Sequence, residues 1–164
     1  NLLNSRGMKL GAFSALASAV MDQEQISFHD GKLYSESWTL VLFNLLFLGP
    51  MFYSLVTPLL SLKKRLLKNI LDFFGLVTIH SAIYSIVHRL MHKVTALRPM
   101  HRHHHKYKEI VLPSNANAVS SNEFIFAYML PFVIGCAIIN PTSYSLSAAT
   151  LVVSGFNICI HSNL

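Results

Sequence analysis

Charged residues and cysteines are both scarce in this chain. Only 12% of the 164 residues are charged, against roughly 25% in an ordinary soluble domain. Hydrophobic residues make up 52%, and the mean hydropathy is +0.46. The two cysteines, Cys136 and Cys159, lie in apolar segments without C-x-x-C spacing, which predicts buried small hydrophobes rather than a disulfide scaffold. The composition therefore indicates a membrane protein with room for one domain.

Several motifs that would indicate other classes of protein are also missing. The sequence has no N-x-[ST] acceptor, no secretory signal with a cleavage site, no G-x-G-x-x-G fingerprint and no haem attachment motif. Any redox chemistry would therefore need an external electron source. Because the chain starts at Asn1 and stops at Leu164, we expect it to be incomplete at both ends.

The positive charge is unevenly placed. The net charge is +6, and most of the thirteen Lys and Arg residues fall in 63–68 and 89–108, beside long apolar segments. In that setting they predict cytosolic flanks that face anionic headgroups, rather than a surface for nucleic acid.

Four apolar segments predict an all-α integral-membrane domain with about three to four membrane helices. Trp38 to Leu60 is uncharged and exceeds the roughly 20 residues that a spanning helix needs. We expect Trp38 to be an interfacial anchor, Gly49-Pro50 to be a kink, and the basic end that follows to be cytosolic. Lys9 to Met21 is too short to span and predicts an interfacial helix or the stub of a truncated one.

The other segments lead to the domain division. Residues 69–87 are apolar with basic flanks on both sides, which favours a shallow or re-entrant helix, although a spanning helix stays open. Residues 124–139 and 143–160 flank an Asn-Pro turn and predict a membrane hairpin that returns His161 to the side of His101. Asp22 to Ser37 predicts a loop. We therefore expect an N-terminal segment, 1–37, and a membrane domain, 38–164.

Most of the nine histidines lie between His80 and His105. On helices, the spacing of His88 and His92 places both on one face, and so does the spacing of His101, His104 and His105. Either group alone is weak evidence, because H-x3-H occurs by chance and a histidine run can be a solvated basic tract. Together, at the edge of an apolar segment where ionisable residues are costly, they predict a metal centre, since imidazole suits iron, zinc, copper and nickel.

These residues resemble the fatty acid hydroxylase and sterol desaturase superfamily. Its motifs H-R-x-x-H and H-[KR]-x-H-H are matched by His88-Arg89-x-x-His92 and by His101-Arg102-x-His104-His105. Tyr84 and Glu123 resemble two further residues of the family pattern, as does His161, and the resemblance covers about residues 70–164. It departs from the family at Ser81, where an acidic residue is usual, and in lacking the final H-x-x-H-H cluster.

The resemblance implies an oxidoreductase that uses two histidine-held irons and O2 to hydroxylate or desaturate a lipid such as a fatty acid, sterol or sphingolipid. It also implies a place in the endoplasmic reticulum membrane, a metal site on the cytosolic surface, and electrons from a b-type cytochrome and its reductase. The implied metal ligands are His88, His92, His101, His104, His105 and His161. Beside them, Arg89, Arg102 and Lys106 are expected to contact lipid headgroups or the acidic electron donor.

Two alternatives stay open at the level of sequence. A truncated, inactive relative would keep the fold without the chemistry, because the final histidine cluster is missing. A metal-ion transporter would carry paired histidines, but it needs them near the bilayer midplane with acidic company. His29 and His103 are expected to be dispensable, and His80 is open between a ligand, a neighbour of the ligands and a packed residue.

Overall fold

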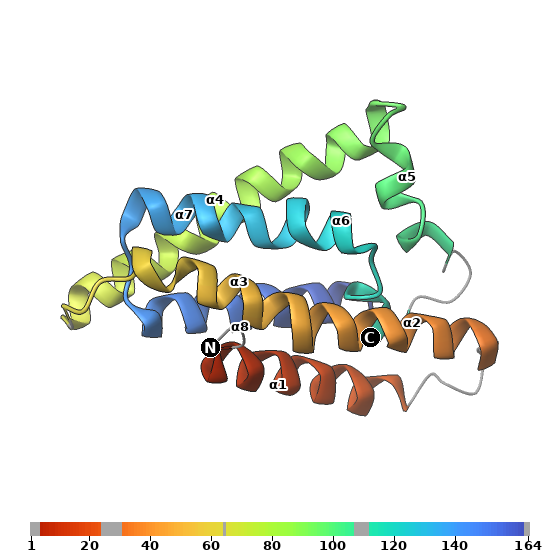
Figure 1. The fold of residues 1–164 in the computed structure, drawn as a ribbon, viewed down its shortest axis with the longest axis horizontal. Helices are drawn as coiled ribbons and strands as arrows, with labels where there is room; N and C mark the ends of the chain where they lie inside the picture. Colours follow the sequence, from red (N-terminus) through yellow and green to blue (C-terminus); the bar gives the residue numbers. More distant parts are fainter. Residues whose placement is uncertain (1–3, 24–30, 64, 107–111, 163–164) are drawn as a thin grey trace.

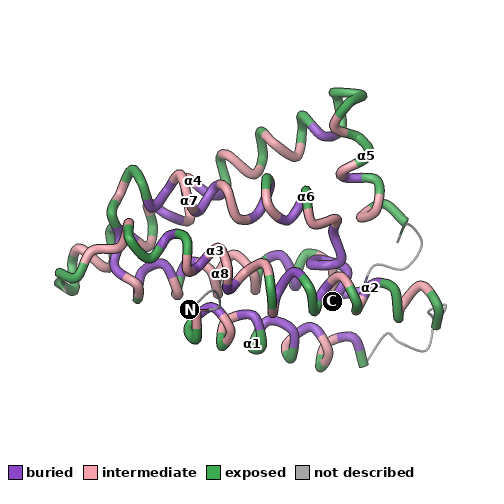
Figure 2. The backbone as a smooth tube through the Cα atoms, viewed as in Figure 1, coloured by how far each residue is buried: buried purple, intermediate pink, exposed green. Residues whose placement is uncertain are grey.

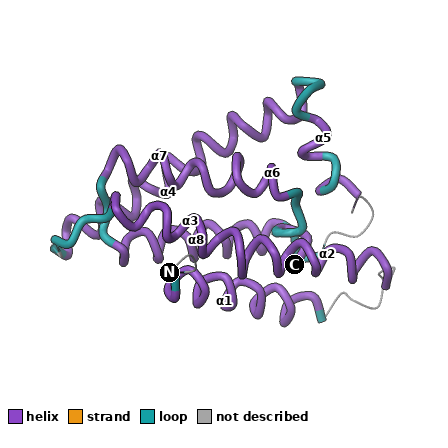
Figure 3. Tube along the Cα trace, viewed as in Figure 1, coloured by secondary structure: helices purple, strands orange, loops and turns teal. Residues whose placement is uncertain are grey.

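All regular structure in the described residues is helical, apart from one isolated bridge between Ser61 and Thr142 (Figure 3). The computed structural model describes residues 4–23, 31–63, 65–106 and 112–162. The helices are α1 (Ser5–Asp22), α2 (Gly31–Phe43), α3 (Gly49–Val56), α4 (Leu66–Lys93), α5 (Arg98–His101), α6 (Ser121–Glu123), α7 (Leu130–Ile139) and α8 (Ser143–Ile160). Two π-helical turns, Asn44–Leu48 and Phe124–Met129, join α2 to α3 and α6 to α7, and short 3-10 turns cover Thr57–Leu59, His104–Lys106 and Pro113–Ala116.

Four continuous helical stretches among the described residues are long and apolar enough to cross a membrane: 31–59, 66–93, 121–139 and 143–160. The expected all-α fold is therefore confirmed, and the number of helices long and apolar enough to cross a membrane agrees with the expected three to four. Large apolar side chains such as Leu55, Phe74, Ile138 and Phe156 are exposed on these helices, as suits an exterior solvated by lipid. The chain is compatible with an integral membrane protein.

The helices run roughly along one long axis, with α4 on one side of the bundle and α1 on the other (Figure 1). Helix α4 packs against both α7 and α8, and α1 packs against α3 and α8. One apolar core, which includes Tyr53, Leu76 and Phe132, fills the part of the bundle away from α5. A second, which includes Val41, Met91 and Phe124, lies beneath the α4–α5 turn. Figure 2 shows that this turn and the α3–α4 connection are the exposed ends.

Helix α4 does not contain the re-entrant turn favoured by its basic flanks. It is one uninterrupted helix of 28 residues, or about 42 Å at 1.5 Å per residue. The basic residues near Lys68 and those near Lys93 therefore lie at opposite ends of the bundle. If α4 crosses the membrane, only one of the two basic groups can face the cytosol. The charge distribution therefore does not select an orientation.

The segment around Pro50 is a widened turn. The Gly49 N–H donates to the Asn44 carbonyl, five residues earlier, which makes Asn44–Leu48 π-helical. Proline has no N–H, and its ring crowds the preceding turn of an α-helix, so a wider turn relieves the clash. The irregularity expected at Gly49-Pro50 is thus present, immediately before the proline.

Helix α1 is longer than expected and belongs to the bundle. The Asn4 side chain caps it by accepting the backbone N–H groups of Arg6 and Gly7 at 2.9 and 3.3 Å, so the helix begins at Ser5 rather than near Lys9. It lies alongside α3 (Figure 1) rather than apart at an interface. The loop expected from Asp22 to Ser37 is wrong for residues 31–37, which form the start of α2; residues 24–30 lie outside the described part. The expected boundary between residues 37 and 38 falls within α2.

The hairpin geometry of residues 124–160 is confirmed. The chain reverses at Asn140-Pro141-Thr142, and Asn140 takes a left-handed conformation with φ 50°. Its side-chain amide donates to the Leu59 carbonyl at 2.7 Å, while the Ser61 N–H donates to the Pro141 carbonyl at 2.8 Å. The turn is therefore fastened to the α3–α4 connection.

This turn supports a first prediction. Asn140→Ala should destabilise the protein by about 2–3 kcal/mol, because alanine tolerates a left-handed backbone poorly and the bond to Leu59 is lost. Asn140→Gly should cost only about 1 kcal/mol, since glycine accepts the conformation. Unfolding of both variants in a denaturing-detergent titration would measure the difference; equal losses would show that the backbone conformation is not what matters.

A buried connecting segment, residues 112–119, which contains only the short 3-10 turn Pro113–Ala116, was not expected from the sequence. All of these residues are buried. The Asn44 amide donates to the carbonyls of Asn117 and Val119 at 3.0 and 2.9 Å, and the Asn157 amide donates to the Ala116 carbonyl at 3.0 Å. Polar residues inside apolar helices thus satisfy the backbone of this segment, as irregular backbone within a membrane bundle requires.

Candidate metal centre

The last turns of α4 carry the first two predicted ligands. His88 and His92 are one turn apart on the same face, and their Nε2 atoms are 3.2 Å apart. His88 is partly buried and His92 is exposed. The helix ends directly afterwards, at Lys93, so these imidazoles lie where the chain turns toward α5.

The third ligand candidate comes from α5. The turn at Val94–Leu97 folds the four-residue helix Arg98–His101 back across the end of α4. This buries His101 and places its Nε2 3.2 Å from the Nε2 of His92. His88, His92 and His101 each offer one ring nitrogen, all within 4.8 Å of one another, and could hold a metal ion.

A buried carboxylate orients His101. Glu123, at the end of α6, is fully buried, and its Oε1 accepts a hydrogen bond from His101 Nδ1 at 2.6 Å. Because Nδ1 carries the hydrogen, Nε2 of a neutral His101 presents its lone pair to His88 and His92. Histidine ligands in metalloproteins are commonly held in this way by a carboxylate.

The hydrogens available on these nitrogens cannot account for both Nε2–Nε2 contacts, which favours a cation between them. Two pairs of Nε2 atoms, His88–His92 and His92–His101, are each 3.2 Å apart. His92 Nε2 can carry one hydrogen and direct it at one neighbour only, so hydrogen bonds cannot fill both contacts around a neutral His92 and a neutral His101. Two nitrogens at about 2.1 Å from a metal, with an angle of about 100° between them, are about 3.2 Å apart. The spacings of these two pairs therefore fit a shared metal ion.

Two of the remaining predicted ligands, His104 and His161, form a second group beside the first, and His105 lies against the first group. His161, just past the end of α8, places its Nε2 3.2 Å from His104 Nε2, and its Nδ1 donates to the Asn157 carbonyl at 2.7 Å. His105 meets the His92 and His101 rings edge-on, with centroids 5.0 and 4.5 Å apart. The His101 and His104 rings stack at 5.5 Å, which joins the two groups into one cluster.

The second group is held in the form that metal binding requires. Burial, reinforced by the nearby His161 and His101, lowers the pKa of His104 to about 3. Burial also lowers the pKa of His161, although its bond to Asn157 opposes this. Both imidazoles are therefore neutral at pH 7, and a metal ligand must be deprotonated.

One expectation about the second motif is wrong. His101, His104 and His105 were expected to share a helix face, but α5 ends at His101, and His104 and His105 lie in a separate 3-10 turn. The three rings nevertheless come together, with His101 and His105 at 4.5 Å and His104 and His105 at 5.9 Å. Folding of the chain over the end of α4, rather than helical periodicity, gathers them.

His80 is not among the converging nitrogens. It is buried two turns below His88, with its Nε2 3.1 Å from the Tyr128 carbonyl. The Tyr84 ring lies between the two histidines, stacked on His80 at 6.1 Å and on His88 at 5.4 Å. The sequence left His80 open between a ligand, a neighbour of the ligands and a packed residue. Its position agrees with the last two. His29 lies outside the described residues.

Glu123 is a buried neighbour of the histidine cluster that the spacing of the histidines alone does not reveal. Ser120 and Glu123 match the capping pattern S-x-x-E, and the Ser120 Oγ accepts the Glu123 N–H at 3.1 Å. The same hydroxyl donates to the Met100 carbonyl at 2.6 Å, which fastens α6 to α5. The Glu123 carboxylate turns to His101 instead of completing the cap. The sequence does indicate Glu123 by its position. It is an acidic residue at a helix start, between a histidine motif and an apolar segment.

A second prediction concerns this carboxylate. Glu123→Gln should lower metal affinity by roughly 10- to 100-fold, because an amide holds the His101 N–H less strongly and does not enforce the tautomer. Anaerobic titration with Co²⁺ would measure it, using the d–d absorption of the bound ion. Glu36→Gln, which changes an exposed glutamate, is the matched control; equal loss in both variants would assign the effect to net charge.

Comparisons with protein-family models, curated proteins and solved structures find no match to this chain.

Proposed function

We propose that this chain forms the metal-binding part of an O2-dependent membrane oxidoreductase that hydroxylates or desaturates a lipid. The observation that carries the proposal is the convergence of His88, His92 and His101 within 4.8 Å, backed by the buried Glu123. Resemblance of the two histidine motifs to the fatty acid hydroxylase and sterol desaturase superfamily supplies the reaction class.

Iron is proposed over other metals because of the reaction and the number of imidazoles. Zinc would fit the triad geometrically, but it has no redox chemistry. The six histidines fall into two adjoining groups, one around His101 and one at His104 and His161, which suits two ions. When bound, two irons would supply the activation of O2 and the removal of hydrogen from an unactivated C–H bond.

The chain's own residues would bind, orient and shield this centre. The histidines bind the metals, and Glu123 fixes the tautomer of His101. Beneath the cluster, Met91 and Phe124 are almost fully buried, which excludes water from the bundle side. Electrons have to come from outside the chain, and a b-type cytochrome with its reductase is the proposed source.

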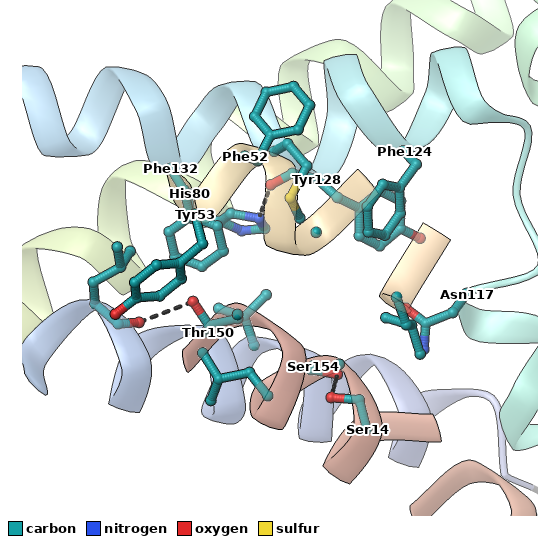
Figure 4. A pocket seen from close by; sticks show the side chains of 18 of the residues that line it. Ser14, Phe52, Tyr53, His80, Asn117, Phe124, Tyr128, Phe132, Thr150 and Ser154 are labelled. Carbon is teal, nitrogen blue, oxygen red and sulfur yellow. Dashed lines mark hydrogen bonds between the residues drawn. The ribbon is translucent and has the colours of Figure 1, made fainter. Parts of the chain in front are cut away.

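An apolar cavity within the bundle supports a lipid substrate. It has a volume of about 90 Å³ and lies between α1, α3, α4, α7 and α8. Figure 4 shows Phe132, Tyr53 and His80 beside this space, with Ser14 and Ser154 hydrogen-bonded to each other at 3.0 Å on its α1–α8 side. His80 is two turns, or about 12 Å along α4, from His88. A short apolar segment of a lipid near the histidine cluster would thus find space in the bundle.

The geometry weakens the transporter alternative, and only a product assay separates the inactive relative from the enzyme. A transporter needs ligands near the bilayer midplane, whereas the cluster lies at the end of α4, over the turn to α5. An inactive relative would keep the cluster and make no product. Location in the endoplasmic reticulum with a cytosolic metal site remains part of the proposal.

The experiment uses the full-length protein, purified in an uncharged detergent. Bound metal is measured by mass spectrometry, and membranes containing the protein are supplied with reductant and ¹⁸O2. We expect iron to predominate and one ¹⁸O atom to enter a lipid alcohol, or a lipid to lose two hydrogens. Bound iron without either product would support the inactive relative, and zinc in place of iron would refute the oxidoreductase.

A further inference from the structure

A second pocket opens beside the histidine cluster, on the side away from the bundle cavity. It has a volume of about 420 Å³ and is formed by the last turn of α4, the α4–α5 turn and α5. His92, His101 and His105 line one part of it, and Arg98 and Arg102 line another. Ligand candidates for the metal and two guanidinium groups therefore share one pocket.

The charge in this pocket is not balanced by any acidic residue in the described part of the chain. No acidic residue lines it, and within the described ranges neither arginine forms an ion pair. Arg98 donates its Nε–H to the His92 carbonyl at 3.2 Å, which uses one of its five N–H donors and fixes the guanidinium beside the cluster. The rest of its planar fork has the geometry that pairs with a carboxylate or a phosphate.

We propose that this pocket binds the anionic head group of the lipid, so that the substrate is an acidic amphiphile bearing a carboxylate or phosphate and not a neutral sterol. The inference rests on the proposed function, because it names the substrate class of the same centre. Thr95 adds a hydroxyl to the pocket and Met91 an apolar side chain, which suits a ligand whose charged head leads into a hydrocarbon.

The position of the arginines favours a small head group over a protein partner. Arg98 and Arg102 line one pocket together with the histidines, whereas docking of an acidic protein uses charges spread over a surface. Arg89 provides the comparison: it is exposed like Arg98 and Arg102, but although the sequence grouped it with Arg102 as a head-group or donor contact, it does not line the pocket. A charge effect that is merely global would act through Arg89 as much as through Arg98.

The test measures equilibrium binding to the full chain in an uncharged detergent, with three probes: hexadecyl phosphate, hexadecanol and inorganic phosphate. Hexadecyl phosphate should bind at least about ten times more tightly than hexadecanol, because the chain is the same and only the anionic head differs. Arg98→Gln and Arg102→Gln should each weaken hexadecyl phosphate about ten-fold and leave hexadecanol unchanged. Arg89→Gln should change neither.

Each contrary result overturns the inference. Equal binding of hexadecyl phosphate and hexadecanol would mean that the head group is not recognised, and equal losses at Arg89 and Arg98 would mean non-specific attraction. Inorganic phosphate that binds as tightly as hexadecyl phosphate would identify a free-anion site. Arginine variants that bind hexadecyl phosphate normally but slow reduction by an acidic donor protein would identify a donor contact. The binding assay needs no metal, so its failure is distinct from failure to find iron or product.

Discussion

Gly11→Ala is expected to destabilise the protein by about 2–3 kcal/mol, although alanine is the better helix former. A Cβ atom at Gly11 would overlap the carbonyl oxygen of Leu45, and one at Gly7 would lie 2.8 Å from the Pro50 Cα. These glycines, four residues apart, allow the backbone of α1 to touch the π-helical turn Asn44–Leu48 and the start of α3, as G-x-x-x-G pairs do in membrane helices. Neither backbone can give way as a flexible side chain could, so α1 must move off the bundle.

Gly155→Ala is the matched control. Gly155 also lies within a helix, α8, but a Cβ there would meet nothing within 4 Å, so this variant should be unchanged or more stable by up to about 1 kcal/mol. Unfolding in a denaturing-detergent titration, followed by far-UV circular dichroism, would compare the two. If both variants keep wild-type stability, the close α1–α3 packing is not present in solution.

The apolar membrane helices could be predicted because length and composition determine them locally. Trp38 to Leu60 and Ser143 to Ile160 were found from run length alone, and the Asn-Pro turn between the last two helices from its dipeptide. The histidine spacing likewise predicted the face that His88 and His92 share. In each of these cases neighbours within a turn or two decide the outcome.

The rest depends on contacts between residues far apart in the chain. Helix α1 was underestimated because its apolar run is short, and its place in the bundle comes from glycine packing against Leu45 and Pro50, which run length does not measure. The basic flanks of α4 suggested a re-entrant turn, but packing against both α7 and α8 keeps the helix straight through. Charged flanks therefore indicate where a helix ends, but they do not predict whether the helix is continuous between those ends.

The buried segment 112–119 shows the same limit from the other direction. Read locally, residues 113–117 are a polar turn. Their burial depends on Asn44 and Asn157, which donate to carbonyls of this segment from 73 and 41 residues away. In the sequence, such a contact is indicated only by a single asparagine within an apolar helix, and the sequence does not show which backbone carbonyl that asparagine binds. Glu123 was noted through its resemblance to the family pattern, but its contact with His101, 22 residues away in the chain, could not be predicted from spacing.

The largest functional effect is expected at the histidine triad. His88→Ala, His92→Ala or His101→Ala should each remove at least about half of the wild-type iron and abolish product, because each removes one of three nitrogens that converge on one point. His104→Ala and His161→Ala should remove about half of the iron, since they form the second group and leave the triad intact. Product should be lost here too, because two metals are needed for the proposed chemistry.

The control for this series is His103→Ala. His103 belongs to the same histidine run, but it is not one of the three residues whose nitrogens converge, so iron and product should stay near wild type. Iron is counted by mass spectrometry and folding is checked by thermal unfolding, because a packed histidine can be replaced at a cost of a few kcal/mol without loss of metal. Triad variants that keep both iron and product would defeat the metal centre. A His103 variant that loses as much as they do would mean that the whole run acts as a general basic tract, since only a defined site distinguishes neighbours that differ by one position.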